Sequence, residues 1–328
     1  MAKVLRLALF AVAVTAVVSG SVLLAVDPGK PSVSALEVTA YRAIGAKHPD
    51  PAIRNGDTLA AKFLGPGERG ILRKAGSDLV LRALDMDTEH AWQSLGVRAG
   101  FALAIHVRTR HIDKAFTDAL QDGATQVVIL GAGLDSRAYR FEDALRSARV
   151  FEVDFPPTQE YKKNRVRRIF HSLPPQVTYV PIDFTKQDLA TVLDAAGYNR
   201  SRKAVFIWEG VSMYLPEAAV DSTLRFVATH AAPGSRIVFD YFLRSTLAAP
   251  PPALRDSMAR LAASGEPMIF GLPDDDPQGF VKQRGLTILE NARNVALLLE
   301  VADHTRGVFT LPSSGPQPRD ASRWCRTR

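Results

Sequence analysis

The stretch that decides the fold runs from Gln126 to Phe141 and reads QVVILGAGLDSRAYRF. Its first part, Val127 to Leu130, is a short run of apolar residues, which is typical of a strand buried on both faces of a sheet. The chain then turns at Gly131 and Gly133 and enters a segment that can start a helix. Strand, glycine turn and helix in this order are characteristic of doubly wound α/β proteins, which bind nucleotides at the carboxyl ends of their strands.

The glycine turn differs from the dinucleotide-binding fingerprint. Ser136 stands where that fingerprint has a Gly or Ala to pack the helix against the strand. No Lys or Arg lies between Gly131 and Asp135. These features weaken the case for a nicotinamide or flavin enzyme and favour a nucleoside cofactor without a pyrophosphate. The alternative is that the two glycines form only a tight turn.

Short apolar runs alternate with helix-length segments from Gln126 onward, as a parallel sheet with helical crossovers requires. The predicted strands are Gln126–Leu130, Val150–Val153, Val177–Pro181, Ala204–Trp208, Arg236–Tyr241 and Leu286–Leu289, with a seventh at Val308–Leu311. Helical patterns precede them at Leu36–Ile44, Thr58–Phe63, Leu79–Leu84 and Val97–Leu120. The predicted fold class is therefore α/β, a doubly wound, mostly parallel, Rossmann-like sheet of seven strands with a helical N-terminal cover.

Three acidic residues follow three successive predicted strands. Asp154 and Glu209 come directly after their strands, and Asp183 follows closely after its own. The carboxyl ends of parallel strands open on one crevice, and Asp154 lies about 20 residues beyond Gly131, where an acidic side chain accepts hydrogen bonds from ribose hydroxyls. An adenosyl cofactor that carries an ammonium and a sulfonium, and no phosphate, suits such a crevice. The alternative for each acid taken alone is a helix N-cap.

The N-terminus departs from an otherwise ordinary globular composition. The run from Leu7 to Val26 carries no charged side chain. About 20 such residues are needed to cross a bilayer, whereas a cleaved signal peptide has a shorter apolar core and a small-x-small cleavage site. We therefore expect a membrane anchor, with association through residues 4–26, and keep open a secretory signal or a segment docked on the domain.

The domain organisation follows from these patterns. Residues 1–33 form the apolar segment and a linker, 34–311 form one catalytic domain, and 312–328 form a disordered tail. Within the domain, 34–125 would be the helical cover and 126–311 the α/β core.

The charge and the sparse metal-binding residues narrow the function. The net charge of +7 is scattered, and its densest cluster, Lys162 to Arg168, has no interleaved aromatic residues, so nucleic acid is not an expected partner. One cysteine and seven histidines without ligand spacing predict no metal site.

Several ordered motifs match a known family. LGAGLDSRAYRF, followed by FEVDFP (151–156), YVPIDF (179–184) and IWEGVSMYL (207–215), resembles the leucine carboxyl methyltransferase family. The likeness is greatest to its bacterial branch of S-adenosylmethionine-dependent methyltransferases, common in actinobacteria, and covers roughly residues 34 to 310. VRTRHID (107–113) and GEPMIFGLP (265–273) belong to it as well. The apolar N-terminal run and the tail after Leu311 are not part of the family pattern.

The resemblance assigns expected roles in binding S-adenosyl-L-methionine. Gly131 and Gly133 would line the methionine part, Asp154 would hold the ribose, and Asp183 with Phe184 would hold the adenine. Glu209 would meet the amino group, and Arg108 would pair with the cofactor carboxylate, the alternative being a surface arginine. Arg137 and Tyr139 are expected to support the turn, and Tyr214 either faces the transferred methyl or packs.

The implied reaction is methyl transfer to an unidentified acceptor. A carboxylate acceptor is already ionised near neutral pH and needs no general base, whereas a hydroxyl acceptor does. His106, His111 and His230 are candidates for such a base by residue type alone. Two alternatives remain, an NAD-dependent oxidoreductase and a catalytically inactive tethered homologue. Because S-adenosylmethionine is a cytosolic metabolite, we expect the domain to face the cytoplasm.

Overall fold

A computed structural model describes residues 31–48, 54–65, 97–292 and 296–301 of the chain. Within these ranges one sheet has the strand order β3-β2-β1-β4-β5-β7-β6. The strands are β1 (Gln126–Leu130), β2 (Arg149–Asp154), β3 (Val177–Pro181), β4 (Ala204–Trp208), β5 (Arg236–Phe239), β6 (Leu286–Ala292) and β7 (Ala296–Val301). Strands β1 to β5 are parallel, and β7 runs antiparallel to β5 and β6. The predicted doubly wound, mostly parallel α/β fold is confirmed.

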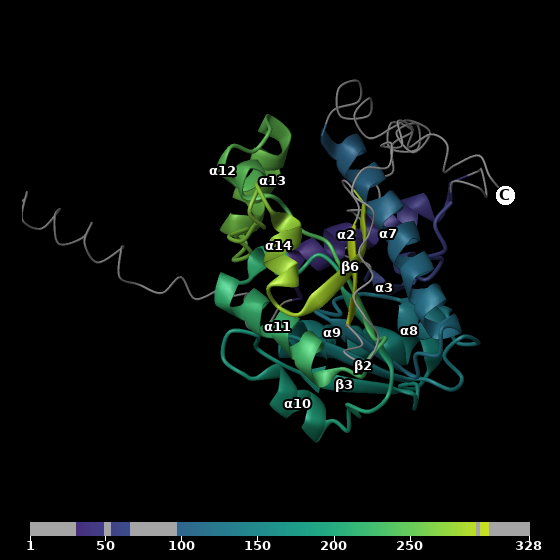
Figure 1. Cartoon of the computed structure of the whole chain (residues 1–328). Coiled ribbons are helices and arrows are strands. Elements are labelled where there is room, and N and C mark those ends of the chain that lie inside the picture. Colours follow the sequence, from purple (N-terminus) through teal and green to yellow (C-terminus); the bar gives the residue numbers. More distant parts are fainter. Residues whose placement is uncertain (1–30, 49–53, 66–96, 293–295, 302–328) are drawn as a thin grey trace, which may run out of the picture.

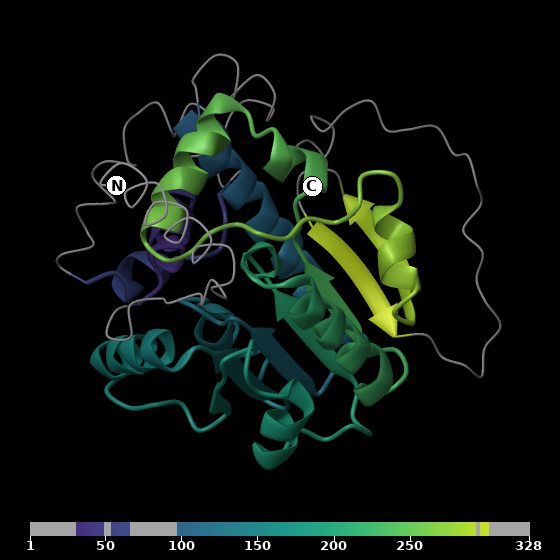
Figure 2. The same ribbon diagram turned by 90° about the vertical axis from the view of Figure 1, so that its left-hand side faces the viewer.

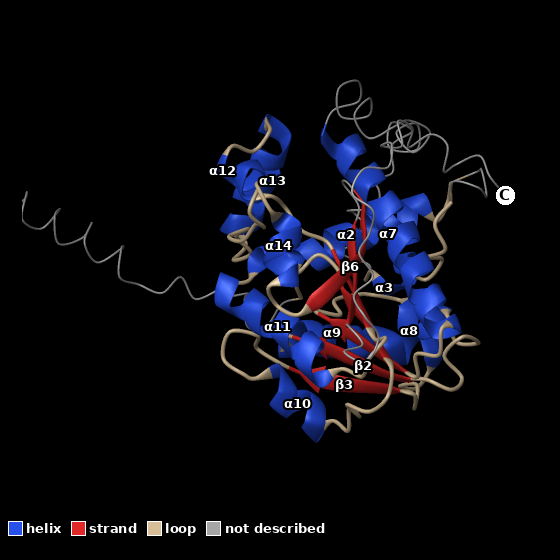
Figure 3. Cartoon of the chain, viewed as in Figure 1, coloured by secondary structure: helices blue, strands red, loops and turns tan. Residues whose placement is uncertain are grey.

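The central strands are buried on both faces because their side chains alternate between two apolar cores. In β1, Val128 and Leu130 point into one core, whereas Val127 and Ile129 point into the other. The first core is completed by α10 (Leu189–Ala195), α11 (Glu217–His230) and α14 (Pro277–Lys282). The second is completed by α2 (Val33–Gly45), α3 (Ala60–Phe63), α7 (Val97–Gln121), α8 (Arg137–Arg140) and α9 (Pro156–Phe170). Helices therefore cover the strands on both sides, as Figure 3 shows.

Two further helices lie beyond the sheet and contribute to the site. They are α12 (Arg244–Ala248) and α13 (Pro252–Ala263), which Figure 1 shows together at the side of the molecule. An ion pair of 3.0 Å between Arg260 of α13 and Glu37 of α2 joins this insertion to the N-terminal helix. In Figure 2, α13 (green) approaches the purple N-terminal segment above the strands. The helical N-terminal cover and the insertion between β5 and β6 thus meet above the strands.

Some predicted boundaries differ from those observed. Strand β5 ends at Phe239 instead of Tyr241, because the Asp240 carbonyl accepts a hydrogen bond from the Ser212 hydroxyl and the chain leaves the sheet. The second predicted helix begins only at Ala60. The β6 strand extends to Ala292, beyond the predicted end at Leu289. The expected strand at 308–311 and the helix at 79–84 lie outside the described residues, and β7 pairs with β5 and β6.

The expected membrane anchor also lies outside the described residues, since these begin at residue 31. Among the residues that the structure does describe, no helix has the length and apolar character needed to span a bilayer.

Candidate functional site

A cavity of about 800 Å³ opens at the carboxyl ends of the parallel strands. The strand order reverses between β1 and β4, and ligands bind at such a switch point in open α/β sheets. All seven residues that the sequence singled out line this cavity: Arg108, Gly131, Gly133, Asp154, Asp183, Phe184 and Glu209. The structure therefore brings them together from α7 and from the ends of β1, β2, β3 and β4.

The glycine turn after β1 is fixed by its own backbone hydrogen bonds. The amides of Gly131 and Ala132 donate to the Val153 carbonyl at 2.7 and 3.0 Å, and the Gly133 amide donates to Asp154 at 2.6 Å. Gly131 has φ +64°, and a Cβ there would lie 2.3 Å from a methyl carbon of Val211. Only glycine fits this position, because both the conformation and the space exclude a side chain.

Asp154 is the residue that fastens this turn to β2. One carboxylate oxygen accepts from the Gly133 amide and the other from the Phe155 amide at 2.7 Å. Each oxygen keeps a second lone pair for a ligand. Burial raises the pKa of Asp154 to about 6 against the effect of these two donors. The Asp154 carboxylate lines the cavity beside the turn and can accept further hydrogen bonds from a ligand.

Glu209 lies between two arginines after β4. Arg108 Nε donates to one carboxylate oxygen at 2.9 Å, and Arg137 Nη1 donates to the other at 2.8 Å. Burial by itself would raise the pKa of Glu209, but the Arg137 and Arg108 guanidiniums outweigh it and hold the pKa at about 2. Glu209 is therefore ionised, and its charge is shared between the two cations.

Arg108 is anchored on two sides and keeps one nitrogen unused. Its Nη1 also bonds Asp240 at 2.5 Å, and the Gly210 amide donates to the second oxygen of that carboxylate at 2.6 Å. The buried Nη2 of Arg108 has no hydrogen-bond partner among the described residues. The alternative interpretation of Arg108 as a surface arginine is wrong, because this residue is 9% exposed and lines the cavity.

Arg137 supports the site from behind the turn. It is 1% exposed, does not line the cavity, and bonds Asp113 and Asp135 in addition to Glu209. This is the supporting place that its sequence motif predicted. Asp240, by contrast, was missed by the sequence reasoning, although an acidic residue at the end of a strand was the signal that had identified Asp154 and Glu209.

Asp183 and Phe184 lie at the cavity edge beyond β3. Thr185 donates to Asp183 through its amide and its hydroxyl, at 3.0 and 2.6 Å, and Lys186 pairs with the other oxygen at 2.9 Å. These contacts lower the pKa of Asp183 despite partial burial. Phe184 packs against the first apolar core beside it. This edge combines an anionic acceptor with an aromatic ring.

A buried ion pair lies beneath the glycine turn. Lys162 of α9 pairs with Glu152 of β2 at 2.9 Å, both side chains being 1% exposed, and Lys162 also donates to the Ala132 carbonyl at 3.4 Å. Burial raises the pKa of Glu152 to about 7, against the opposing charge of Lys162. Lys162 therefore connects the turn to the helix that follows the next strand.

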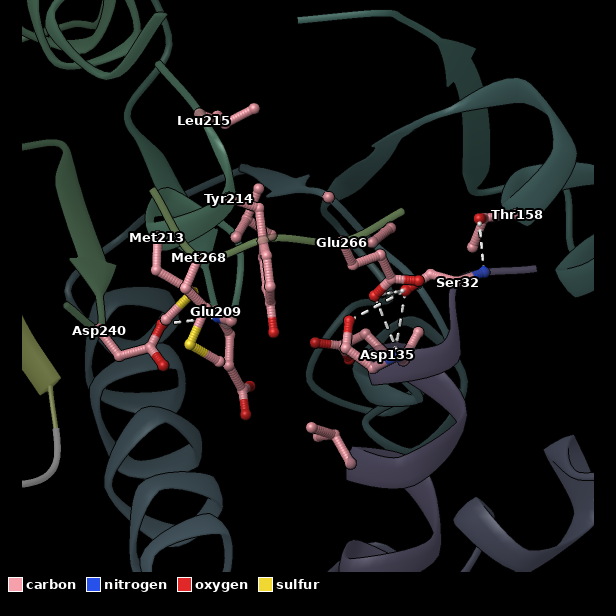
Figure 4. Close-up of a pocket in the computed structure, with 18 of the residues that line it drawn as sticks. Ser32, Asp135, Thr158, Glu209, Met213, Tyr214, Leu215, Asp240, Glu266 and Met268 are labelled. Carbon is pink, nitrogen blue, oxygen red and sulfur yellow. Dashed lines mark hydrogen bonds between the residues drawn. The ribbon is translucent and has the colours of Figure 1, made fainter. Parts of the chain in front are cut away.

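The far side of the cavity is closed by the start of α2 and by Glu266. Glu266 accepts hydrogen bonds from the Val33 amide at 2.6 Å, the Ser34 amide at 3.0 Å and the Ser32 hydroxyl at 3.1 Å. The Ser32 amide donates to the Thr158 hydroxyl at 3.2 Å. In Figure 4, Glu266 and Ser32 lie on one side of Tyr214, and Glu209, Met213 and Met268 lie on the other. Sequence reasoning gave Glu266 no role.

The histidines considered as bases do not lie at the site. His106, His111 and His230 are all absent from the described lining of the cavity. His106 packs near Asn55, its Nδ1 lying 3.4 Å from the Asn55 amide nitrogen, and His230 stacks on Phe226 of its own helix. Among the described lining residues, the titratable side chains are carboxylates, arginines and tyrosines.

Comparison with known proteins places the chain in a family. The sequence model described as leucine carboxyl methyltransferase matches residues 35–228, which is more than half of the chain. The chain therefore belongs to the leucine carboxyl methyltransferase family, as its motifs indicated.

Relatives in bacteria share this region. The chain is 36% identical over 186 residues to YktD of Bacillus subtilis, provisionally named an S-adenosyl-L-methionine-dependent methyltransferase, with 56% of this chain and 61% of that protein covered. It is also 36% identical over 211 residues to a protein of Mycolicibacterium paratuberculosis given the same provisional name, with 64% of each chain covered. The match thus spans less than two thirds of the length of these relatives.

Among solved structures, a DUF574 family protein from Streptomyces avermitilis is 16% identical. The comparison covers 84% of this chain and 100% of that chain, with a TM-score of 0.49. The family assignment depends on the sequence relationships alone.

Proposed function

We propose that this protein binds S-adenosyl-L-methionine in the cavity and transfers its methyl group to an acceptor bound beside it. The observation that carries the proposal is the convergence of a glycine turn and the carboxylates Asp154, Asp183 and Glu209 on one cavity. Six carboxylates and two arginines line the described cavity, and this excess of negative charge favours a cationic sulfonium ligand. Family membership and the provisional names of the relatives agree with this reading.

The adenosine part would lie over the ends of β2 and β3. The free lone pairs of Asp154 would accept hydrogen bonds from the ribose hydroxyls, as an acidic residue after the second strand does in related folds. Asp183 would accept from the exocyclic amine of adenine, and the Phe184 ring would pack beside the base.

The amino-acid part would lie between the glycine turn and α7. Gly131 and Gly133, both with positive φ, form the tight turn that would border it. Glu209 would attract the ammonium group, and the unused Nη2 of Arg108 would donate to the carboxylate. Because Arg108 is held by Glu209 and Asp240, that nitrogen is already oriented before the ligand arrives.

The chemical step would be an in-line displacement. A lone pair of the acceptor forms a bond to the sulfonium methyl, and the electron pair of the broken carbon–sulfur bond stays on sulfur. The positive charge disperses as the reaction proceeds, so the protein contributes mainly by aligning the reactants and excluding water. The half-buried phenol of Tyr214, whose pKa is raised by desolvation, would stay neutral and serve as a hydrogen-bond donor beside the reaction path.

The glycine turn also bears on the nicotinamide alternative. A pyrophosphate needs free backbone amides at such a turn. Here the amides of Gly131, Ala132 and Gly133 already donate to Val153 and Asp154. The surrounding carboxylates would repel phosphate charges as well. These contacts favour the phosphate-free cofactor.

Isothermal titration of the protein with S-adenosylmethionine, S-adenosylhomocysteine and NAD tests the proposal. We expect the first two to bind and NAD not to bind. Replacing Asp154 with Ala should abolish binding, whereas Asp143→Ala, at a side chain that is 89% exposed, should leave it unchanged. Binding of NAD alone would refute the proposal, and methyl-donor turnover assayed by mass spectrometry separates an active enzyme from an inactive homologue.

We also propose that the domain works on the cytoplasmic side of the membrane, because S-adenosylmethionine is a cytosolic metabolite. The uncharged run from Leu7 to Val26 would tether it there. Protease protection of the full chain in inside-out and right-side-out vesicles tests the orientation. Protection of the domain in inside-out vesicles would contradict it.

A further inference from the structure

Asp240 is a buried carboxylate at the cavity whose position is fixed from two sides. It lies directly after β5, and in Figure 4 it is on the same side of Tyr214 as Glu209. One carboxylate oxygen accepts from the Gly210 amide at 2.6 Å, and the backbone carbonyl of Asp240 accepts from the Ser212 hydroxyl at 2.8 Å. The segment after β4 therefore holds both the side chain and the backbone of Asp240 in place.

The two carboxylates that bind Arg108 differ in what else they contact. Glu209 is shared between two guanidiniums, because Arg137 Nη1 donates to its second oxygen at 2.8 Å. Glu209 is also the group proposed to attract the ammonium of the cofactor. Asp240 gives one oxygen to Arg108 Nη1 and the other to a backbone amide, so its charge is not divided between two arginines. Asp240 is thus the carboxylate that serves Arg108 in particular.

Together the two carboxylates fix the plane of the Arg108 guanidinium. Nε is held by Glu209 and Nη1 by Asp240, so a rotation of the group would break an ion pair. The buried Nη2 is left without a hydrogen-bond partner in the part of the chain that the structure describes. Gly210 has φ +70°, and a Cβ there would lie 3.6 Å from this nitrogen. The lack of a side chain at Gly210 therefore keeps one approach to Nη2 open.

A fixed guanidinium binds a carboxylate better than a mobile one. A long arginine side chain has many rotamers, and holding it in one of them costs conformational entropy. Here that cost is met within the protein before a ligand arrives. An asparagine at this position would have a single acceptor oxygen, which could serve Arg108 or the Gly210 amide but not both. Loss of the Asp240 carboxylate should therefore release Arg108.

We infer that Asp240 is a positioning residue that acts through Arg108 and makes the cavity select adenosyl ligands that carry a free carboxylate. The inference rests on the proposed function and adds a specificity to the same site. An adenosyl ligand that has lost its carboxylate keeps the adenosine and the ammonium, which Asp154, Asp183 and Glu209 would attract equally well. The Nη2 donor of Arg108 is the group that would distinguish the two ligands.

A matched pair of ligands tests the inference with the full chain. S-adenosylhomocysteine and its decarboxylated analogue differ only in the carboxylate, and titration calorimetry at pH 7.5 gives the ratio of their affinities. We expect the wild type to prefer S-adenosylhomocysteine at least about tenfold, which is the value of a hydrogen bond to a charged group. In Asp240→Asn this preference should fall at least about fivefold, while the affinity for the analogue stays the same. The control Asp143→Asn, at a side chain that is 89% exposed, should keep the wild-type preference.

The direction of the change separates positioning from other roles of Asp240. Removal of a negative charge would by itself strengthen the binding of a carboxylate, so a larger preference in Asp240→Asn would overturn the inference. An equal loss of affinity for both ligands would mark a structural role alone and would overturn it as well. In an Arg108→Met background, replacing Asp240 with Asn should leave the ratio of affinities unchanged, and a further change would show that Asp240 does not act through Arg108.

Binding of the decarboxylated analogue reports folding in each variant. If Asp240→Asn binds neither ligand, the test passes to Asp240→Glu, which keeps the charge but displaces the carboxylate by one methylene. The preference should fall in this variant too, and a wild-type preference would contradict the positioning role. Failure of the wild type to bind either ligand would refute the proposed function itself, whereas equal binding of both would overturn only the assigned roles of Arg108 and Asp240.

Discussion

At the scale of single residues, the site consists of carboxylates whose charge states are set by different neighbours. Burial raises the pKa of Asp154 to about 6, although two backbone amides donate hydrogen bonds to its carboxylate and act in the opposite direction. Glu209 is equally enclosed but lies between two guanidiniums, and its pKa is about 2. Two carboxylates in one cavity therefore titrate far apart, and each leads to a different experiment.

Binding of an adenosine should depend on the ionisation of Asp154. With a pKa of about 6, the carboxylate is mostly ionised at pH 7.5 and only about one-tenth ionised at pH 5. We predict that methylthioadenosine, which lacks the amino and carboxylate groups of the cofactor, binds about tenfold more weakly at pH 5 than at pH 7.5. Titration calorimetry across this range measures the effect. In Asp154→Asn the dependence should vanish, while Asp143→Asn should retain it, and a flat wild-type profile would contradict the role of Asp154.

Removing the charge of Glu209 should destabilise the fold. Glu209→Gln leaves Arg108 and Arg137 without a shared anion in a buried place, and breaking such a pair costs on the order of 3 kcal/mol of unfolding free energy. Urea denaturation measures the change. The matched variant Glu217→Gln breaks an ion pair with Arg244 in which both side chains are more than half exposed, so the expected loss is below about 1 kcal/mol. Similar losses in the two variants would refute the structural role of Glu209.

At the scale of elements, α9 does more than cover one face of the sheet. Its Lys162 reaches under the turn that follows β1 and meets both Glu152 and the Ala132 carbonyl. A helix after the second strand thereby fixes the backbone after the first, and the geometry of the turn depends on a buried charge pair.

The pH dependence of stability should reveal this pair. The pKa of Glu152 is about 7 in the fold and 4.5 ordinarily, so the folded state retains a proton and its stability falls as pH rises between these values. In Lys162→Met the folded pKa rises further, since the cation that opposed burial is gone. We predict that from pH 7 to 8 the variant loses up to about 1.4 kcal/mol of unfolding free energy and the wild type about 0.4 kcal/mol, a difference of about 1 kcal/mol.

Denaturation curves at pH 6, 7 and 8 provide the measurement. Lys163→Met is the control. Lys163, the next residue on α9, pairs with the half-exposed Glu160, so this variant should show the wild-type slope of stability against pH. A Lys162→Met slope equal to that of Lys163→Met would disprove the buried coupling.

At the scale of the whole molecule, Glu266 connects parts that are distant in sequence. It accepts hydrogen bonds from the first turn of α2, and Ser32 before that helix bonds Thr158 of α9. The insertion, the N-terminal helix and the sheet therefore meet around the cavity. A carboxylate at a helix N-terminus is also favoured by the partial positive charge of the free amides there.

Glu266→Gln should loosen this junction. The amide side chain keeps one acceptor oxygen and loses the charge, so we predict a loss of about 1 kcal/mol in unfolding free energy. Hydrogen exchange followed by mass spectrometry should show that residues 33–45 exchange faster in the variant than in the wild type, whereas the exchange of β1 is the same in both. Gln283→Ala, at the residue that follows α14, should leave the exchange of residues 33–45 unchanged. Unaltered exchange in Glu266→Gln would contradict the junction.

The sequence predicted the site as far as local patterns extend. The strand ends located Asp154 and Glu209, because an acid after a buried apolar run is a short-range signal. The same rule would have found Asp240, but the fifth strand was extended through it to Tyr241. Glu266 could not have been found in this way, since its partners lie more than 200 residues earlier in the chain and leave no periodic trace. The burial of Lys162 and Arg165 was missed, because a run of basic residues such as 162–168 is typical of a solvated helix face.

The backbone amides of the glycine turn already donate hydrogen bonds within the protein, and this affects which cellular metabolites can compete for the cavity. ATP and other adenine nucleotides are abundant metabolites and carry the same adenosine group as the cofactor. A turn whose amides already donate to Val153 and Asp154 gives their phosphates no donors, and the acidic surroundings repel them. The protein should therefore stay unoccupied by the nucleotide pool and respond to the supply of its methyl donor alone.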